Sequence, residues 1–265
     1  MSGKTLRLKR FLTPLNGRLV IFPLDHGVTC GPASGLRQMG KVMRMGIRGG
    51  VDAIVMHKGM LPLLETVTQP LPGIFMHLSA STQLGEAPHH KVLVGTVQEA
   101  IRRGADGVSV HVNLGGSREP DMLRDLGEVG TDCAKWQIPL LVMIYVRGEQ
   151  TPSPVPDDTI AHAARVAAEL GADIIKIPAP RDYDVLAQIT ESLPVPVVVA
   201  GGSKYADTRL FLEHLQKALG SGVRGVAIGR NVFQHDRPEA LLIAIRNMVH
   251  HGFTAAQALD QFSQK

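Results

Sequence analysis

Eight short apolar segments spaced along the chain constrain its fold more than any other feature. Each has the length of a β-strand, and amphipathic stretches such as 93–104 and 157–171 lie between most of them. Strands that alternate with helices form parallel βα units, so eight units predict a closed (β/α)8 barrel, with an open doubly wound sheet as the alternative. We expect one domain over residues 1–265, with a short N-terminal arm and a C-terminal helix. The apolar segments begin at residues 19, 53, 74, 107, 140, 173, 195 and 225.

The boundaries of one predicted helix show how the units are separated. Asp157 and Asp158 are residue types that cap helix N-termini, and Gly171 is typical of a C-terminal stop. The proline-rich stretch 151–158 resembles a linker between domains, but strands of the same pattern lie on both sides of it. We therefore interpret it as a loop after the fifth strand.

A weak repeat predicts the direction of one lysine. The segments GVDAIVMH from 50, GADGVSVH from 104, GADIIKIP from 171 and GVRGVAIG from 222 align without gaps. Their fifth and seventh positions are all large and apolar, which is typical of the face that meets the surrounding helices. The sixth position, on the opposite face, is occupied by Val55, Ser109, Lys176 and Ala227. We therefore expect Lys176 to point into the barrel instead of extending to solvent at a strand end.

A lysine inside a barrel suits covalent chemistry. Desolvation disfavours the ammonium and leaves free amine to attack a carbonyl, which predicts a Schiff base at Lys176. Tyr145 ends the preceding strand and is a candidate acid/base, the alternative being a tyrosine that closes the barrel with its hydroxyl in water. Asp25 ends the first strand and is a candidate to orient substrate hydroxyls, steady an iminium or relay protons. Its alternative is a helix cap or a loop salt bridge.

Glycines follow the seventh and eighth strands, where barrels of this class often bind phosphate. Gly201 and Gly202 let backbone approach an anion closely, while Gly229 precedes Arg230, whose guanidinium is a planar donor. Tight turns with an incidental arginine are the alternative. The candidate substrate-binding set is completed by residues after the first and fifth strands, namely His26 and Arg147.

Four histidines at strand ends raise a metal-dependent alternative. Three of them could hold zinc and polarise a ketone, but they form no local ligand motif. We expect neither a metal nor another cofactor. These histidines are His26, His57, His77 and His111.

Composition excludes several functional classes. The formal charge is +4, the basic residues are scattered, and only 4% of the chain is aromatic, so we expect no nucleic-acid partner. No apolar run approaches a membrane span, and the N-terminus lacks the apolar core of a signal peptide. Cys30 and Cys133 have no metal-ligand spacing and are expected to be reduced thiols in a cytoplasmic protein.

Several motifs carry a resemblance that covers residues 6 to 260. PLDHGVTCGP, HKG, HLSAST, VSVHVNLG, GADIIK, VAGGSK and GVAIGRNVFQH resemble the DhnA-type class I aldolase family. The resemblance implies a barrel with a Schiff-base lysine at Lys176, an acid/base at Tyr145 and an aspartate at Asp25. It also implies a phosphate site at the glycines and arginine named above, and a large ring-type homo-oligomer.

Within that family the chain looks closer to the 2-amino-3,7-dideoxy-D-threo-hept-6-ulosonate synthase branch than to archaeal-type fructose-bisphosphate aldolase. Met143 stands where the latter carry tryptophan, two residues before Tyr145. The resemblance implies an aldolase or transaldolase that takes a small phosphorylated ketose or ketotriose and an aldehyde acceptor. It would join dihydroxyacetone phosphate, or a phosphosugar-derived fragment, to L-aspartate semialdehyde for aromatic or aminohydroxybenzoate biosynthesis.

Two alternatives accompany this interpretation. One is a class I fructose-bisphosphate or other phosphosugar aldolase, and the other is a noncatalytic phosphosugar-binding barrel. The sequence departs from the family where VRG replaces Pro-Arg-Gly after Tyr145, and where IPAPRDYD follows Lys176. Arg181 in the second stretch is either an anion contact or a surface charge.

Overall fold

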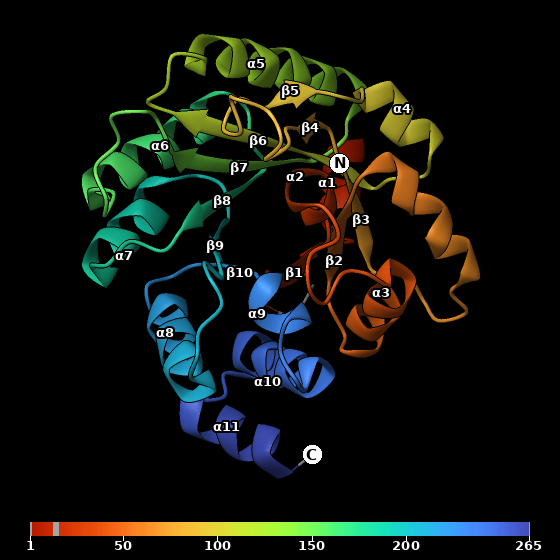
Figure 1. Cartoon of the computed structure of the whole chain (residues 1–265), viewed down its shortest axis with the longest axis vertical. Coiled ribbons are helices and arrows are strands. Elements are labelled where there is room, and N and C mark those ends of the chain that lie inside the picture. Colours follow the sequence, from red (N-terminus) through yellow and green to blue (C-terminus); the bar gives the residue numbers. More distant parts are fainter. Residues whose placement is uncertain (1, 13–15, 265) are drawn as a thin grey trace.

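The chain forms a closed barrel of eight parallel strands, as the alternating pattern predicts, in a computed structural model that describes residues 2–12 and 16–264. Around the barrel the strands follow the order β1-β10-β9-β8-β7-β6-β3-β2 (Figure 1). The open-sheet alternative is therefore wrong. The barrel strands are β1 (Leu19–Pro23), β2 (Ala53–Met56), β3 (Gly73–His77), β6 (Gly107–Leu114), β7 (Leu140–Val146), β8 (Ile174–Pro178), β9 (Val197–Ala200) and β10 (Gly225–Ala227).

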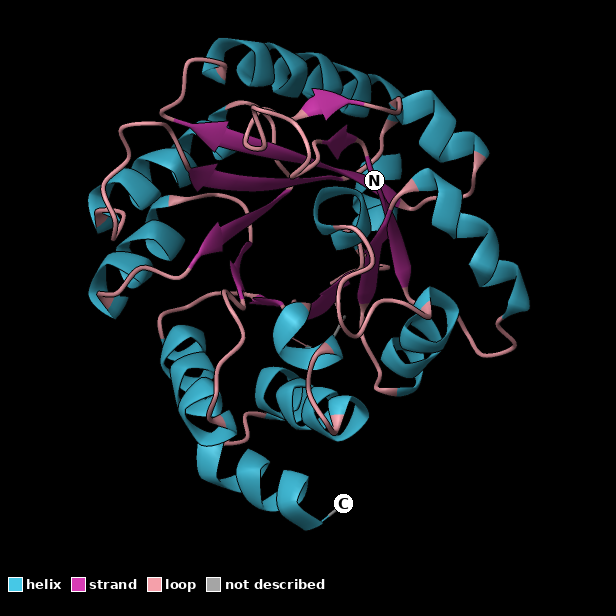
Figure 2. Ribbon diagram, viewed as in Figure 1, coloured by secondary structure: helices cyan, strands magenta, loops and turns pink. Residues whose placement is uncertain are grey.

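Helices surround the barrel on its outside, and Figure 2 shows the resulting ring of helices around the strands. Two short strands, β4 (Ser79–Ala80) and β5 (Val92–Leu93), pair antiparallel as a separate small sheet that the sequence pattern did not predict. The helices are α1 (Gly3–Leu8), α2 (His26–Cys30), α3 (Met39–Arg48), the 3-10 helix η1 (Lys58–Thr66), α4 (Val97–Arg102), α5 (Glu119–Trp136), α6 (Asp157–Glu169), α7 (Tyr183–Ser192), α8 (Thr208–Gly220), α9 (Arg230–Phe233), α10 (Pro238–His251) and α11 (Ala255–Gln264).

Two hydrophobic layers follow from the alternation of side chains along the strands. The outer layer lies between strands and helices and contains Ile175 and Ile177, with the corresponding residues of the other repeat segments. The inner layer fills the barrel and includes Val55 and Ala227. Lys176 lies between the two isoleucines in sequence and is buried on the inner side, so its predicted direction is confirmed.

The N-terminal arm closes one end of the barrel. Phe11 is 1% exposed, and its ring stacks on Phe75 with the ring centroids 3.9 Å apart. Gly73 and Gly107 leave the space for these rings, because a Cβ at either position would lie within 2.6 Å of an aromatic carbon. Phe11 therefore belongs to the inner layer.

Helix α6 begins at residue 157 as predicted, but the N-cap role predicted for Asp157 is wrong. Pro156 occupies the N-cap position, and Asp157 instead accepts hydrogen bonds from the backbone N–H groups of Arg181 and Asp182, at 3.1 and 2.9 Å. Its carboxylate thus joins the loop after β8 to the start of α6. The proline-rich stretch does lie in the loop between β7 and α6, as predicted.

The C-terminal helix α11 packs against α10 and α8. Among the described residues, no helix combines the length and apolar character that a membrane crossing requires.

Candidate active site

Two adjoining cavities open at the C-terminal ends of the barrel strands. The glycine-loop cavity, of about 310 Å³, is bordered by Gly201, Gly202 and Gly229. The loop 81–91 cavity, of about 220 Å³, is bordered by residues of the loop between β4 and β5. Five residues line both cavities, and all five are predicted site residues: His26, Tyr145, Arg147, Lys176 and Arg230.

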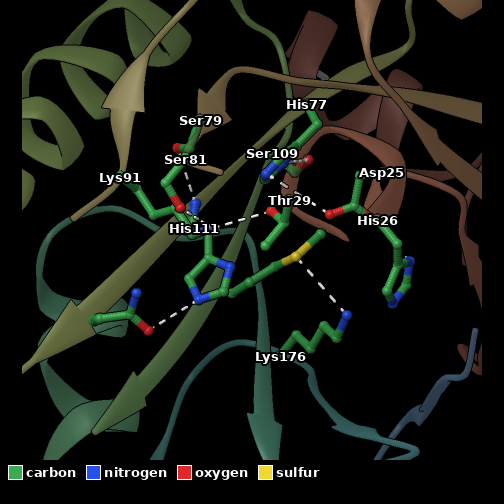
Figure 3. Close-up of polar contacts among 12 residues, drawn as sticks. Asp25, His26, Thr29, His77, Ser79, Ser81, Lys91, Ser109, His111 and Lys176 are labelled. Carbon is green, nitrogen blue, oxygen red and sulfur yellow. Dashed lines mark hydrogen bonds and ion pairs between the residues drawn. The ribbon is translucent and has the colours of Figure 1, made fainter. Parts of the chain in front are cut away.

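Lys176 lies in the middle of β8 and is 6% exposed. Its Nζ contacts the sulfur of Met143 on β7 at 3.8 Å, a weak polar contact (Figure 3). Met143 and Lys176 are paired in the parallel register of β7 and β8, which brings the sulfur beside the amine. Because a thioether is a poor partner for an ammonium, the amine remains available to a carbonyl in the cavity.

Asp25 follows β1 and lines the loop 81–91 cavity. It stands at the N-cap position of α2, yet its side chain makes no capping hydrogen bond, so the cap alternative is wrong. Burial raises its pKa, but the attraction of His77, His26 and Lys176 for the carboxylate outweighs burial, and the pKa lies well below its usual value. The carboxylate is therefore ionised at neutral pH.

Both carboxylate oxygens of Asp25 face imidazoles. Oδ2 lies 3.8 Å from His77 Nε2, and Oδ1 lies 3.8 Å from His26 Nδ1. Among the described residues, Asp25 Oδ1 and His26 Nδ1 are buried without a hydrogen-bond partner. Unpaired buried polar atoms are costly, so their placement beside a cavity indicates a partner that arrives from outside.

His77 and His111 act as neutral hydrogen-bonding groups. His77 Nδ1 pairs with Ser109 Oγ at 2.8 Å, and burial lowers the pKa of His77 to about 3 against the opposing attraction of Asp25. Burial also lowers the pKa of His111, whose Nε2 lies 3.0 Å from Asn113 Oδ1. Within the described ranges, no three His, Cys, Asp or Glu side chains are grouped so that they could hold a metal ion.

Tyr145 ends β7 beside these groups. Its ring lies 5.0 Å from the His111 ring, and the Arg147 guanidinium covers it at 4.2 Å from the ring centroid. A cation over the face of a phenol holds the ring in place. Tyr145 lines both cavities together with Lys176.

Side chains of α9, the short helix after β10, hold the loop after β9 by hydrogen bonds. Asn231 is 4% exposed and donates from Nδ2 to the carbonyls of Gly201 and Ser203, at 2.7 and 3.0 Å. Arg230 donates to the carbonyl of Gly202 at 3.0 Å. Asn231 was not predicted as a site residue. It organises the loop that borders the cavity.

Gly229 packs too closely against its neighbours to carry a side chain. A Cβ would lie 2.7 Å from His26 Cε1 and 3.0 Å from the carbonyl oxygen of Pro23. Gly202 has a φ of 68°, which favours glycine. Both glycines are thus required by local geometry, in addition to any contact with substrate.

Lys91 is the second site residue that sequence reasoning missed. It is 7% exposed and lines the loop 81–91 cavity. In sequence it follows two histidines in an irregular polar stretch, so neither strand nor helix periodicity indicated its direction. Arg181, the other cation considered, is exposed and lines neither cavity.

The family described as DeoC/LacD family aldolase matches residues 19–235. The chain belongs to this family. The predicted resemblance to class I aldolases is confirmed, and the chain is an aldolase.

Two relatives match almost the whole chain. A 2-amino-4,5-dihydroxy-6-oxo-7-(phosphonooxy)heptanoate synthase from Streptomyces griseus is 39% identical over 97% of this chain and 93% of its own length. The 2-amino-3,7-dideoxy-D-threo-hept-6-ulosonate synthase 1 from Archaeoglobus fulgidus is 38% identical over 98% of this chain and 96% of its own length.

A solved structure of an archaeal fructose-1,6-bisphosphate aldolase has the same fold, with a TM-score of 0.84 and 27% identity. The match covers 93% of this chain and 99% of that one. In that structure the catalytic lysine is covalently bound to the carbinolamine intermediate of the substrate.

Proposed function

We propose that the protein is a Schiff-base aldolase that joins a dihydroxyacetone phosphate fragment to L-aspartate semialdehyde, with Lys176 as the nucleophile. The observation that carries the proposal is the position of Lys176, which is buried in the barrel and borders both cavities together with Tyr145. In the archaeal aldolase of the same fold, the catalytic lysine is the residue that bonds to substrate.

The names of the relatives define the substrate class. The product named for the Streptomyces griseus relative has a ketone at C6 and a hydroxyl at C4, which is the pattern of an aldol. Division between C4 and C5 gives dihydroxyacetone phosphate and aspartate semialdehyde. The product named for the Archaeoglobus fulgidus relative divides into the same acceptor and a donor fragment without the phosphate. The acceptor half is common to both named products, so both relatives support its assignment.

The donor step begins at Lys176. Its amine adds to the ketone carbon, and the carbinolamine loses water to give an iminium. The positive charge of Lys176 lowers the pKa of Asp25, so the two groups interact electrostatically. The Asp25 carboxylate would likewise stabilise the positive iminium nitrogen formed on Lys176. A donor hydroxyl placed between Asp25 Oδ1 and His26 Nδ1 would supply the hydrogen-bond partner that these two buried atoms lack.

The carbon–carbon bond forms in the next step. Tyr145 gives its proton to the departing hydroxyl of the carbinolamine, and the phenolate that remains removes a proton from the carbon next to the iminium. The resulting enamine attacks the aldehyde carbon of the acceptor. The aldehyde oxygen takes up the proton from Tyr145 as the bond forms, which leaves an iminium. Water then hydrolyses this iminium, releases the product and restores the amine of Lys176.

The phosphate is assigned to the glycine-loop cavity. Gly201, Gly202 and Gly229 expose backbone there, and Arg230 provides positive charge at its edge. A phosphate fixed at this end determines which donor carbon meets Lys176, and such positioning contributes much of the rate in reactions of this kind. His26 and Arg147, which line both cavities, are assigned to donor and acceptor contacts.

The decisive experiment traps the donor adduct. The protein is incubated with dihydroxyacetone phosphate, and any Schiff base is reduced with borohydride. Intact-mass spectrometry then detects the adduct, and peptide digestion locates it. We expect the adduct on Lys176 in the wild type and none in Lys176→Ala, which should fold normally by circular dichroism. An adduct on another lysine, or unchanged labelling of Lys176→Ala, would refute the assignment.

A second candidate function is cleavage of fructose 1,6-bisphosphate, which the archaeal structural neighbour favours. Comparison of the rates of this cleavage and of the semialdehyde reaction decides between the two. A noncatalytic sugar-phosphate-binding barrel would bind ligand reversibly and give no trapped adduct. Loss of activity on chelation would instead support the metal-dependent alternative.

We also propose that the chain folds as one domain and assembles into a ring-type homo-oligomer, which the resemblance to class I aldolases supports. Size-exclusion chromatography with light scattering tests the assembly. A monomer at micromolar concentration would contradict it.

A further inference from the structure

Lys91 is a second buried lysine in the candidate site, and the reaction steps above do not use it. Its Nζ donates to Ser81 Oγ at 2.6 Å and to Thr29 Oγ1 at 3.3 Å, both neutral oxygens. No ion pair among the described residues includes Lys91. By contrast, Lys58 pairs with Glu99 at 3.1 Å. A buried ammonium without a carboxylate partner is unfavourable, so its retention calls for an anion from outside.

The loop that carries Lys91 holds it in place. β4 and β5 pair through Ser79–Leu93 and Ala80–Val92 at the two ends of this loop. Ser81 Oγ donates to the carbonyl of Pro88 at 2.6 Å, and the backbone N–H of Gln83 donates to the carbonyl of Thr29 in α2 at 3.0 Å. Figure 3 shows Lys91 near Ser81, Thr29 and His111, whereas Lys176 enters the site from β8.

The charge around the loop 81–91 cavity is predominantly positive. Lys91, Arg147, Lys176 and Arg230 line it, and Asp25 is the acidic residue of its lining. Burial lowers the pKa of Lys91, and the nearby Arg147 lowers it further, while Asp25 opposes both. An anion bound beside Lys91 and Arg147 would relieve this excess of positive charge.

The two cavities provide separate binding places for two anionic groups of the substrates. Of these two cavities, Lys91 lines only the loop 81–91 cavity, Gly201 and Gly202 line only the glycine-loop cavity, and Lys176 borders both. A phosphate at the glycines and a carboxylate at Lys91 would therefore lie on different sides of the reactive amine. Dihydroxyacetone phosphate and aspartate semialdehyde provide one such group each.

We propose that Lys91 binds the carboxylate of the aldehyde acceptor and thereby selects acceptors that carry one. The inference rests on the proposed function, and it assigns the acceptor end of the site to the loop between β4 and β5. Arg147, held over Tyr145, provides the second positive charge at this end. Ser81 and Thr29 orient the Lys91 ammonium.

The test compares acceptors that differ in the carboxylate. Aspartate semialdehyde carries an amine and a carboxylate, succinic semialdehyde carries the carboxylate only, and propanal carries neither. In Lys91→Met we expect kcat/KM for both semialdehydes to fall roughly 30- to 100-fold, mainly through KM, because a charge-assisted contact is lost. With propanal as the acceptor, kcat/KM of Lys91→Met should differ from that of the wild type by less than about threefold. Lys91→Arg should recover most of the loss.

Two controls separate folding from binding. Lys58→Met removes a lysine that is paired with Glu99, and all three acceptors should react as in the wild type. Adduct formation on Lys176 from dihydroxyacetone phosphate should proceed at the wild-type rate in Lys91→Met, which also shows that the variant is folded.

Three outcomes would overturn the inference. They are an equal loss with propanal and the semialdehydes, no loss with any acceptor, or borohydride trapping of aspartate semialdehyde on Lys91 itself. Wild-type protein that forms no donor adduct and does not consume aspartate semialdehyde would instead refute the proposed function. The two failures are therefore distinguishable.

Discussion

Replacement of Gly229 by alanine tests whether the glycine-loop cavity depends on close packing. The new Cβ would lie 2.7 Å from His26 Cε1, 3.0 Å from the Pro23 carbonyl oxygen and 3.0 Å from Phe233 Cε1. Ordinary contacts of such atoms begin at about 3.4 Å, so His26 must move by roughly 0.7 Å. Its ring already packs edge-on against Phe233, with centroids 5.3 Å apart, and Pro23 is part of a barrel strand. Neither neighbour can yield freely.

The magnitude follows from this crowding. Overpacking of a rigid site costs about 1–3 kcal/mol, which lowers the melting temperature by about 2–4 °C for each kcal/mol in a chain of this size. Displacement of His26 also misplaces the donor, so kcat/KM for dihydroxyacetone phosphate should fall roughly 10- to 100-fold.

Urea unfolding and steady-state kinetics measure the two effects. Gly59→Ala is the matched control, because a Cβ at Gly59 would meet no atom within 4 Å, and its stability should stay within about 1 kcal/mol of the wild type. The reasoning fails if Gly229→Ala unfolds within about 0.5 kcal/mol of the wild type and keeps its kinetics. It also fails if Gly59→Ala loses as much.

Three further predictions concern other parts of the molecule. Tyr145→Phe should still form the trapped donor adduct on Lys176, but product formation should fall roughly 10²- to 10⁴-fold, because proton transfer is lost; unimpaired product formation would exclude Tyr145 as the acid/base. Phe11→Ala should cost about 3–5 kcal/mol in urea unfolding, since its buried ring stacks on Phe75, and a loss below about 1 kcal/mol would show that the arm is dispensable. His77→Gln should reduce the loss of folding stability that the wild type shows as the pH falls. The pKa of His77 is lowered from 6.5 to about 3 in the fold, so unfolded chains bind its proton first, and stability falls as pH drops below 6.5. This effect amounts to about 2 kcal/mol between pH 7 and 5, and identical pH profiles for the two proteins would contradict it.

The direction of Lys176 could be predicted because it depends on a local rule. Side chains alternate along a strand, and the outer neighbours Ile175 and Ile177 match the apolar positions of three other strands. Once the fold is a barrel, this alternation requires the lysine to face inward. The positions of Tyr145 and Asp25 at strand ends follow in the same way.

The role of Asp157 was mispredicted because its partners are distant in sequence. A carboxylate at the start of a helix normally caps that helix, but here the backbone N–H groups of Arg181 and Asp182 lie within its reach. The capping rule considers only neighbours along the chain. Here the loop after β8 packs against the start of α6, and this contact brings the two N–H donors to Asp157.

Sequence by itself determined the number and order of the barrel strands, the barrel and the inward position of Lys176, since these depend on periodicities that are read over a few residues. Only the tertiary structure decided what surrounds that lysine. Lys91 comes from the irregular loop between β4 and β5, and Asn231 from the four-residue helix α9; neither segment has a periodicity that defines a face. Their partners are set by the way these two segments fold over the barrel. Burial makes the surroundings of these side chains energetically important, because an ammonium or an amide removed from water needs partners within the fold.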